Sequence, residues 1–271
     1  MSMPSGLQPA GYSRQELMVI EAARHVRDGD VVFVGTGLPL LATTLAQRTH
    51  APGVVCVIES GVIAPLVRPT PISVSDPKVM HRAVRLGTLR EVLGCLLQRG
   101  LVDLGFLGGA QIDRYGNINS TLIRTPGATK RLPGSGGGND MASHCRRLLV
   151  ITRHERRRFP ERCDYITSPG FLDGPGARRR AGLNPEFGVT VVTDLAVMET
   201  DPETCALRIV KLMPDVTVEA ARAETAFRPA AAPGLRQVTP PSAEELRVLR
   251  GEVDPGRVYL KDHEPAPGPR R

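Results

Sequence analysis

A run of five apolar residues at positions 54–58 leads directly into Glu59, Ser60 and Gly61. Because the run is short, uninterrupted and rich in β-branched residues, it is typical of a strand that is buried on both faces of a sheet. In open α/β sheets, ligands bind at the carboxyl ends of the strands. A carboxylate at that position is costly unless it is paired or used in chemistry. This segment alone leaves two interpretations of Glu59 open, a solvated or Arg-paired residue and a functional one.

Apolar runs alternate with helix signals along most of the chain. Capping boxes, in which a Ser or Thr side chain and a later Glu satisfy the first amides of a helix, occur at Ser13, Thr88 and Ser242. The expected helices begin near residues 14, 40, 88, 141, 217 and 242, and the expected strands are residues 31–34, 54–58, 102–112, 148–152, 164–170, 189–198 and 207–213. This alternation predicts an α/β fold, and the last two strands predict a hairpin in a more antiparallel C-terminal part.

The 271 residues suit one large domain or two small ones. Aromatic residues make up 4% of the chain and Trp is absent, so aliphatic side chains must build the core. Residues 1–12 are rich in Pro, Gly and Ser, and the chain finishes with the sequence EPAPGPRR. We therefore expect one domain at 13–251, with disordered segments at 1–12 and 252–271.

The net charge of +7 raises nucleic acid as a partner. The basic clusters at 153–158 and 178–180 lack the interleaved aromatic residues on which bases stack. We interpret them as a solvated basic surface, or as a feature that attracts a phosphate-bearing small molecule, and predict no nucleic-acid partner. The five cysteines form no CxxC pair, which disfavours a zinc site, and no metal is predicted. No secretory signal and no apolar run of membrane-spanning length is visible, so we expect a cytoplasmic protein without membrane contact.

Two glycine-rich turns are candidates for binding an anion. The first contains Gly35 and Gly37 and lies between a predicted strand and a predicted helix, an arrangement that can cradle phosphate. It lacks the third glycine of a dinucleotide-binding fingerprint. The second contains Gly136, Gly137 and Gly138, whose backbone amides can point inward without interference from a Cβ atom. Such a loop can hold a phosphate or a developing oxyanion, and the alternative is a flexible linker.

The chain resembles the β subunits of family I coenzyme A transferases, in particular the glutaconate and 3-oxoadipate type. The stretches that carry this resemblance are VGTGLP (34–39), IESGVI (58–63), VDLGFLGGAQIDRYGNINST (102–121), RLPGSGGGND (131–140), DYITSPG (164–170) and VVTDLAVME (191–199). Together they extend the resemblance over about residues 14–250. It implies an open α/β/α sandwich with a mostly parallel sheet and an α subunit as partner, commonly in an α2β2 heterotetramer. It also implies a catabolic enzyme that has coenzyme A as substrate and covalent intermediate and no permanently bound cofactor.

The resemblance implies a role for Glu59. In this family the glutamate of the motif attacks the thioester of an acyl-CoA and then carries CoA as an enzyme thioester, with ping-pong kinetics. The loop at Gly136, Gly137 and Gly138 would supply one backbone donor to the oxyanion, and the α subunit would supply another. Two residues depart from the family pattern, Gly138, where Ala is usual, and Arg124, where Gly is common. Arg124 lies in a region that often shapes the acyl pocket.

Four further residues are predicted to line the substrate site, namely Ser60, Gly61, Gln111 and Asn117. Turn capping together with Asp113 is the alternative role for Asn117. Ser60 is also a candidate for local hydrogen bonding at the end of the strand.

The resemblance favours dicarboxylic or 3-oxo acids as substrates. One alternative function is an acyl-CoA hydrolase or ring-opening hydrolase on the same scaffold, although relatives of that kind lack the glutamate. Another is a non-catalytic module that binds anions or nucleic acid, which only the positive charge supports.

Overall fold

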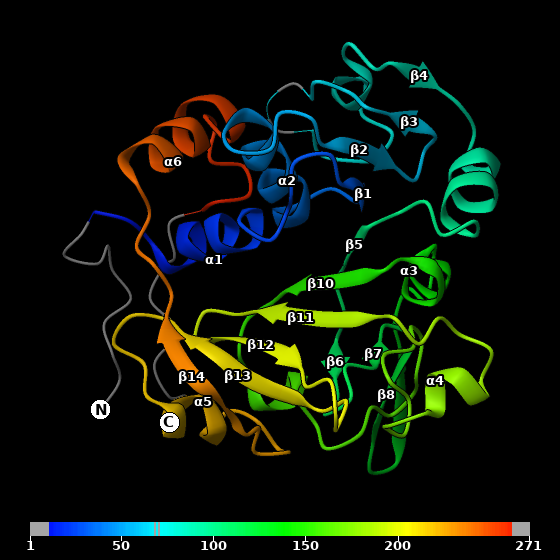
Figure 1. Ribbon diagram of the computed structural model, residues 1–271, viewed down its shortest axis with the longest axis vertical. Helices are drawn as coiled ribbons and strands as arrows, with labels where there is room; N and C mark the ends of the chain where they lie inside the picture. Colours follow the sequence, from blue (N-terminus) through cyan, green and yellow to red (C-terminus); the bar gives the residue numbers. More distant parts are fainter. Residues whose placement is uncertain (1–10, 68, 70, 262–271) are drawn as a thin grey trace.

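The computed structural model describes residues 11–67, 69 and 71–261, and its centre is a single ten-stranded sheet (Figure 1). The strands stand in the order β14-β13-β12-β11-β10-β5-β1-β2-β3-β4. Five neighbouring strands are parallel, namely β11 (Gly188–Val192), β10 (Arg147–Ile151), β5 (Leu104–Leu107), β1 (Val31–Val34) and β2 (Val55–Ile58). The outer strands are β3 (Val62–Ile63), β4 (Arg85–Leu86), β12 (Ala196–Thr200), β13 (Leu207–Leu212) and β14 (Ala231–Gln237). Because β12 is antiparallel to both β11 and β13, the predicted α/β fold with a more antiparallel C-terminal part is confirmed.

The chain places strands on both sides of β1. It leaves β1 through α2 (Leu38–Arg48) and reaches β2 on one side, whereas β5 pairs with the opposite side of β1. Where neighbouring connections diverge in this way, a crevice opens outside the carboxyl ends of the strands. The carboxyl ends of β1 and β5 are therefore the expected place for a ligand.

Helices α1 (Arg14–Ala23), α2 and α6 (Ala243–Val248) gather on one side of the central strands (Figure 1). The predicted capping box at Ser13 is present, since its Oγ accepts from the Glu16 amide at 3.1 Å and the Glu16 carboxylate accepts from the Ser13 amide at 2.7 Å. The remaining helical segments include α3 (Gly138–His144), α4 (Ala177–Arg180), α5 (Val218–Ala223), the 3-10 turns η1 (Pro77–Met80) and η3 (Arg156–Arg158), and the π-helices η2 (Glu91–Leu97) and η4 (Leu249–Val253).

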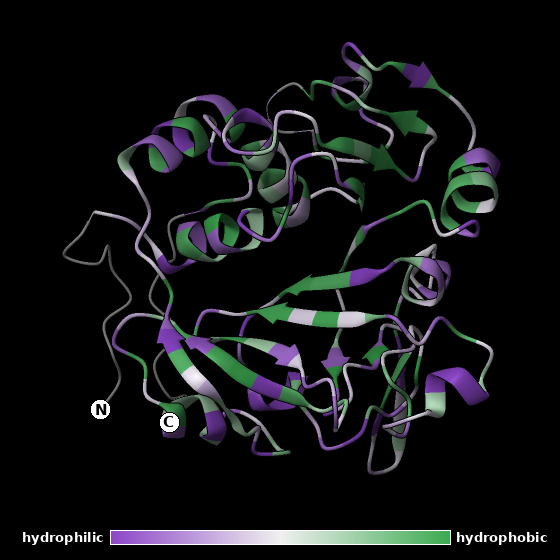
Figure 2. Ribbon diagram, in the orientation of Figure 1, coloured by the Kyte–Doolittle hydropathy of each residue, from purple (hydrophilic) through white to green (hydrophobic). Residues whose placement is uncertain are grey.

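The core is mainly aliphatic, as the composition predicts, and Figure 2 shows β10 and β11 in the hydrophobic colour over most of their length. One segment is an exception, because it exposes large apolar side chains instead of burying them. Between residues 66 and 89, six large apolar side chains are 39–81% exposed: Leu66, Ile72, Met80, Val84, Leu86 and Leu89. The segment includes β4, which is an edge strand of the sheet. In the described part of the chain, no helix is both long and apolar enough to cross a bilayer.

Two predicted strands differ from the structure because the chain leaves the main sheet. The strand expected at 102–112 divides into β5 and β6 (Gln111–Ile112), and β6 pairs with β7 (Ile118–Asn119) in a separate small sheet. The segment expected as a strand at 164–170 makes only an isolated bridge from Ser168 to β7. Both segments serve this small sheet rather than the ten-stranded one.

The strand expected at 189–198 is also wrong, since it is two strands joined by a turn. The hydroxyl of Thr193 accepts hydrogen bonds from the amides of Leu195 and Ala196 at 3.2 and 2.9 Å, and this reverses the chain between β11 and β12. Six strands were not predicted: β3, β4, β7, β14, β8 (Leu122–Thr125) and β9 (Ala128–Arg131). The strands β3 and β4 have two residues each, which is too short to give a sequence pattern. The strand β14 contains Pro and Gly, which have low strand propensity.

Residues 252–261, which we expected in a disordered tail, pack on the domain in the structure. The buried carboxylate of Asp254 accepts hydrogen bonds from the backbone amides of residues 258–260 at 2.9–3.1 Å. At the other end of the chain, Tyr12 is buried. The disorder predicted for the first ten and last ten residues lies outside the described part of the chain.

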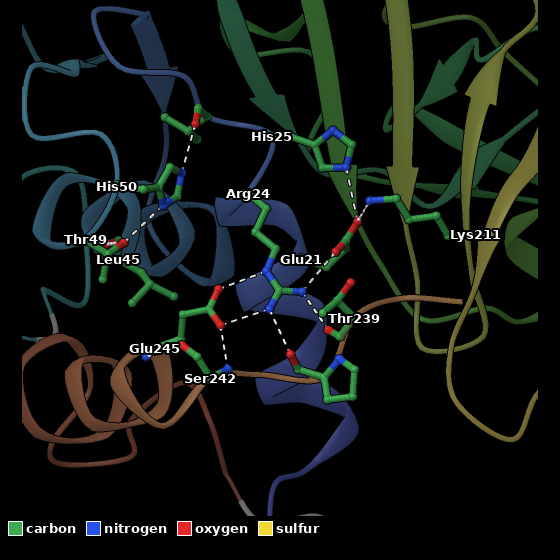
Figure 3. Close-up of polar contacts among 12 residues, drawn as sticks. Glu21, Arg24, His25, Leu45, Thr49, His50, Lys211, Thr239, Ser242 and Glu245 are labelled. Atoms are coloured by element: carbon green, nitrogen blue, oxygen red, sulfur yellow. Dashed lines mark hydrogen bonds and ion pairs between the residues drawn. The ribbon is translucent and has the colours of Figure 1, made fainter. Parts of the chain in front are cut away.

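A cluster of charged side chains joins α1 to the C-terminal part of the fold (Figure 3). The buried Glu21 accepts a hydrogen bond from Lys211 on β13 at 2.5 Å, and His25 Nε2 lies 3.6 Å from the same carboxylate. Arg24 holds both oxygens of Glu245 at 2.9 Å. Burial raises the pKa of Glu21, but His25 and Lys211 together hold it below its ordinary value of 4.5. Glu21 therefore stays ionised and links α1 to β13.

The buried His154 predicts a loss of stability on acidification. Its two ring nitrogens contact the hydroxyls of Thr193 and Thr225 at 2.9 and 2.8 Å, and burial lowers its pKa from 6.5 to about 4. The unfolded chain takes up a proton near pH 6.5, whereas the folded chain does so only near pH 4. Stability that is present above pH 6.5 is therefore lost as the pH falls through this window, by about 3 kcal/mol for this residue.

Urea unfolding at neutral pH and at about pH 4 measures this loss. The variant His154→Gln should lose less free energy of unfolding on acidification than the wild type, and the difference should be about 3 kcal/mol. The variant His144→Gln, which keeps His154, serves as control and should match the wild type. Equal losses in all three proteins would contradict the assignment.

Candidate functional site

A cavity of about 230 Å³ lies at the carboxyl ends of β1, β2 and β5, where the divergent connections predict a ligand site. Its lining residues come from the segments 33–39, 106–108 and 135–141, together with Glu59. Among the lining residues, Glu59 is the only one with an ionisable side chain. Among all described residues, no group of three or more His, Cys, Asp and Glu side chains is arranged to hold a metal ion. The chemistry of this cavity therefore centres on one carboxylate.

Glu59 occupies the first position of a tight turn rather than a simple strand end. The strand β2 reverses directly into β3, and the amide of Gly61 donates to the carbonyl of Ile58 at 2.9 Å to close the turn. Gly61 has a φ of +102°, a conformation that favours glycine. A three-residue hairpin loop with a glycine in its last position has this geometry. The sequence predicted the position of Glu59 at the end of β2 but not the reversal that follows.

The Glu59 carboxylate faces the glycine loop. A Cβ atom placed on Gly137 would lie 3.4 Å from Glu59 Oε1, and one placed on Gly136 would lie 3.9 Å from it. Glu59 is half-buried, and within the described part of the chain its carboxylate has neither an ion pair nor a hydrogen bond. The Arg-paired interpretation of Glu59 is therefore wrong for the described residues.

The glycine loop presents two backbone amides that have no acceptor within the described chain. The amide of Gly138 donates to the carbonyl of Ser135 at 2.9 Å, and the amide of Asn139 donates to the Ser135 hydroxyl at 2.9 Å. The amides of Gly136 and Gly137 make no such bond. Because Gly136 has a φ of +50° and Gly137 is buried, the loop is a shaped turn that leads into α3 rather than the flexible linker that was the alternative.

Two glycines outside the loop's centre let it approach the sheet. A Cβ atom on Gly105 of β5 would lie 2.5 Å from Met141 Cγ, so this glycine allows α3 to pack closely on the strand. A Cβ atom on Gly138 would lie 3.1 Å from Ser168 Oγ. The departure from the family's usual Ala at position 138 therefore leaves room for a serine hydroxyl.

Of the two glycines in the predicted anion-binding turn, only one lines the cavity. Gly35 is a lining residue, whereas Gly37 precedes α2 with a φ of +94° and is not. The sequence analysis missed Thr36, Phe33 and Phe106, which line the cavity beside Gly35. Their position at the carboxyl ends of buried apolar runs is the signal that could have identified them.

Ser60 and Gly61 line a different cavity from Glu59. This second cavity has a volume of about 260 Å³ and lies beside the turn between β2 and β3. It is also lined by apolar residues that include Met80 and Leu86. Ser60 is exposed and makes no side-chain hydrogen bond in the described part of the chain. Although Ser60 follows Glu59 directly in the sequence, the two residues therefore line separate cavities.

Gln111 is a residue of β6 in the small β6–β7 sheet and does not line either cavity. Its side chain donates to Asp164 at 3.0 Å and accepts from Asn119 at 2.7 Å and from the Asp164 amide at 3.0 Å. Arg124, the second departure from the family pattern, also bonds to Asp164. The side chain of Gln111 is thus bonded to Asp164, which is also bonded to Arg124 on β8.

Asn117 likewise lies outside both cavities and has the turn-capping role that was its alternative. Its amide nitrogen donates to both oxygens of Asp113 and to the Leu172 carbonyl at 2.9–3.1 Å, and its amide oxygen accepts from the amides of Gly170 and Leu172 at 2.9 Å. Burial raises the pKa of Asp113 above its ordinary value, although Asn117 and nearby backbone amides donate to it. Asn117 thus satisfies a buried carboxyl group and fixes the segment that follows residue 167.

Arg178 was assigned to a solvated basic cluster, but the structure buries it. It donates to the carbonyls of Pro169, Gly170 and Ala142 at 2.7–3.1 Å and stacks on Phe187 at 3.7 Å. Burial lowers its pKa to about 10. Since Ala142 lies on α3, Arg178 ties the helix that carries the glycine loop to the segment beside it.

Comparison with known proteins gives consistent matches. A family model described as coenzyme A transferase matches residues 16–223 of this chain. The B subunit of the 3-oxoadipate CoA-transferase of Pseudomonas knackmussii is 36% identical over 242 residues, which cover 89% of this chain and 93% of that protein. The B subunit of the glutaconate CoA-transferase of Acidaminococcus fermentans is 34% identical over 256 residues, which cover 92% and 96%.

The crystal structure of glutaconate coenzyme A-transferase from Acidaminococcus fermentans matches with a TM-score of 0.86 at 32% identity, over 93% of this chain and 98% of that chain. A more distant relative has a different activity. The cholesterol ring-cleaving hydrolase IpdB subunit of Mycobacterium tuberculosis is 26% identical over 263 residues, which cover 93% of this chain and 98% of that protein. Since transferases and a hydrolase are both similar to this chain, overall similarity does not decide between the two activities, and the residues of the site have to.

The structural role of Asn117 gives a stability prediction. Replacing it in Asn117→Ala removes five hydrogen bonds and leaves the buried Asp113 carboxyl group without its side-chain donor. We expect a loss of roughly 3–5 kcal/mol in the free energy of unfolding, measured by urea denaturation. The control Asn184→Ala removes one hydrogen bond, to the Glu186 amide, and should cost less than about 1 kcal/mol. Comparable stabilities for the two variants would contradict this role.

Proposed function

This chain belongs to the coenzyme A transferase family and is a CoA-transferase, and from that premise we propose that it is a β subunit that moves CoA between an acyl-CoA and a carboxylic acid through Glu59. The family match covers most of the described residues, and the relatives at 34–36% identity are B subunits of CoA-transferases. The activity of the family is thus the starting point, and the identity of the reacting residue is the proposal.

One observation carries this proposal. Within the described residues, a carboxylate without a partner lies close to two glycines whose backbone amides have no acceptor, in a cavity at the carboxyl ends of parallel strands. A carboxylate held by a cation would be less basic and less free to move. Glu59 has no such partner in the described part of the chain, and the glycine loop offers donors where an oxyanion would form.

The reaction requires a carboxylate as nucleophile. Glu59 attacks the thioester carbonyl of the acyl-CoA, and expulsion of the CoA thiolate leaves a mixed anhydride. The thiolate then attacks the glutamyl carbonyl, releases the first carboxylic acid and leaves a glutamyl-CoA thioester. The acceptor acid reverses these two steps and departs as a new acyl-CoA, which gives ping-pong kinetics. An anhydride retains the reactivity of the original thioester, whereas an ester on a serine would not.

Each attack produces a tetrahedral oxyanion that needs hydrogen-bond donors. The amides of Gly136 and Gly137 are suited to this role because they are adjacent, unengaged and close to the Glu59 carboxylate. Removal of one donor from an oxyanion hole typically lowers the rate by about 10²–10³-fold. Ser135 binds the amide of Asn139 and Arg178 binds the carbonyl of Ala142, so both hold the start of the helix that follows these amides.

An α subunit is the proposed partner, because the relatives at 34–36% identity are B subunits. The exposed apolar side chains at 66–89 support an interface near the Glu59 turn, since large exposed apolar patches mark interaction sites. The names of these relatives support dicarboxylic or 3-oxo acids as the proposed substrates, and the family resemblance alone supports the proposed α2β2 assembly. Coenzyme A would bind as substrate, with no resident cofactor.

A hydrolase is the second candidate, because the IpdB subunit, a ring-cleaving hydrolase, is similar over nearly the whole chain. Incubation of the reconstituted complex with an acyl-CoA and no acceptor acid separates the two. A hydrolase releases free CoA continuously, whereas a transferase requires the acceptor for sustained turnover.

Loss of the nucleophile should abolish exchange. In the complex with the α subunit, Glu59→Ala and Glu59→Gln should lower the rate of CoA exchange by about 10³-fold or more, because no anhydride can form. Borohydride treatment of the wild-type complex incubated with acyl-CoA should reduce the glutamyl thioester and change the mass of the peptide that contains residue 59. Assembly with the α subunit, measured by size-exclusion chromatography, should be unchanged.

The control for these variants is Glu203→Ala, which removes an exposed carboxylate far along the chain from the cavity. It should exchange CoA at the wild-type rate. Normal turnover by Glu59→Ala, or a borohydride-dependent mass change elsewhere in the chain, would refute Glu59 as the nucleophile.

The apolar segment gives a separate prediction about the partner. A charge introduced by Val84→Asp should weaken association with the α subunit by about 10-fold or more in a titration followed by calorimetry, because burying an unpaired carboxylate is costly. The control Val258→Asp changes an exposed valine outside this segment and should bind as the wild type does. Unchanged affinity of Val84→Asp would place the interface on another face.

A further inference from the structure

The helix over residues 89–97 is attached to the Glu59 turn through backbone atoms. The amide of Gly87 donates to the carbonyl of Gly61 at 2.8 Å, and a Cβ atom on Gly61 would lie 2.4 Å from the Gly87 carbonyl oxygen. Directly after Gly87, the predicted capping box is present, since the Thr88 amide donates to the Glu91 carboxylate at 2.8 Å. The start of this helix is therefore fixed relative to Gly61, and through the turn relative to Glu59.

The helix predicted to begin near residue 88 is present, and it adopts the π form from Glu91 to Leu97. The amide of Gln98 donates to the carbonyl of Leu93 at 3.0 Å, a bond that spans five residues rather than four. Such wide turns are rare and are found frequently at functional sites. Leu93 lies within this π-helix, and its carbonyl accepts the wide hydrogen bond.

Leu93 and Glu59 border the same small space. A Cβ atom placed on Gly137 would lie 3.4 Å from Leu93 Cδ2 and 3.4 Å from Glu59 Oε1. A group of methyl size above Gly137 would therefore touch both side chains. Leu93 is half-buried and packs against the hydrophobic core, so its position is supported from behind.

The acylated forms of Glu59 are vulnerable to water in this space. Water that attacks the glutamyl-CoA thioester would form a bond to the glutamyl carbonyl carbon, break the C–S bond, and release CoA thiol and the free carboxylate. The energy of the thioester would then be lost rather than transferred. On its side of this space, Leu93 offers an attacking water no hydrogen-bond partner and occupies volume that the water would need.

We propose that Leu93 is a specificity-determining residue that favours transfer over hydrolysis by excluding water from the space between Glu59 and Gly137. This inference rests on the proposed role of Glu59 as the residue that carries CoA. It assigns a task to the π-helix, which otherwise has none in the reaction. In this reaction, water competes with the carboxylic acid as the acceptor that attacks the glutamyl-CoA thioester.

The ratio of hydrolysis to transfer tests this inference. In the complex with the α subunit, free CoA release without acceptor is compared with CoA exchange in the presence of acceptor, using glutaconyl-CoA or 3-oxoadipyl-CoA as donor. The variants Leu93→Ala and Leu93→Asn should raise this ratio by about 10-fold or more, a change of about 1.4 kcal/mol in relative barrier height. The conservative variant Leu93→Met should keep the wild-type ratio, because it restores an apolar wall.

A matched control separates this effect from general destabilisation. Leu96→Ala makes the same truncation on the same helix at another half-buried position that packs on the core. It should lower both rates together and leave the ratio unchanged. A ratio that stays at the wild-type value in Leu93→Ala and Leu93→Asn would overturn the inference while leaving the exchange reaction intact. Absence of exchange in the wild-type complex would instead refute the proposed function, and the role of Leu93 with it.

Discussion

The unpaired carboxylate of Glu59 is the constraint on which the site depends. A carboxylate removed from water loses hydration energy, and proteins usually compensate with a cation or with several hydrogen bonds. Within the described chain Glu59 has neither, and it remains half-buried beside a cavity. A cation at this position would stabilise the charge but would also reduce its power to attack a carbonyl. The Glu59 carboxylate therefore keeps its charge without a compensating partner in the described chain, at the position where the proposed chemistry needs a nucleophile.

Contacts to backbone atoms position the parts of the chain on both sides of Glu59. On one side, Gly61 packs directly on Gly87, which attaches the turn to the start of a helix. On the other side, Arg178 binds four backbone carbonyls, including that of Ala142 on α3. Arg178 is a buried cation, yet its partners are carbonyl oxygens, so it holds the glycine loop without placing a counter-ion against Glu59. Both devices fix geometry and leave the charge of the nucleophile undisturbed.

The sequence predicted those features that follow from local physical rules, namely the buried run before Glu59, the glycine loop and the capping boxes. Contacts between distant segments have no such local signal. The burial of Arg178 depends on carbonyls that lie 8 to 36 positions earlier in the chain. Gln111 and Asn117 lie near strand ends, as binding residues often do, but partners more than 50 positions away engage both side chains. Conversely, Leu93 has no polar group to mark it, and only its distance to the space above the glycine loop indicates a role.

The reversal of the chain after β2 has a further consequence for how the site is reached. A parallel continuation would need a long crossover, usually a helix, from the carboxyl end of β2. The antiparallel return into β3 needs only the short turn that contains Glu59, so no crossover helix leaves this end of β2. The strands that follow, β3 and β4, carry the sheet outward to an edge that exposes Val84 and Leu86. A hairpin at this point therefore sets a reactive carboxylate close to an apolar edge, where a second subunit could approach it directly.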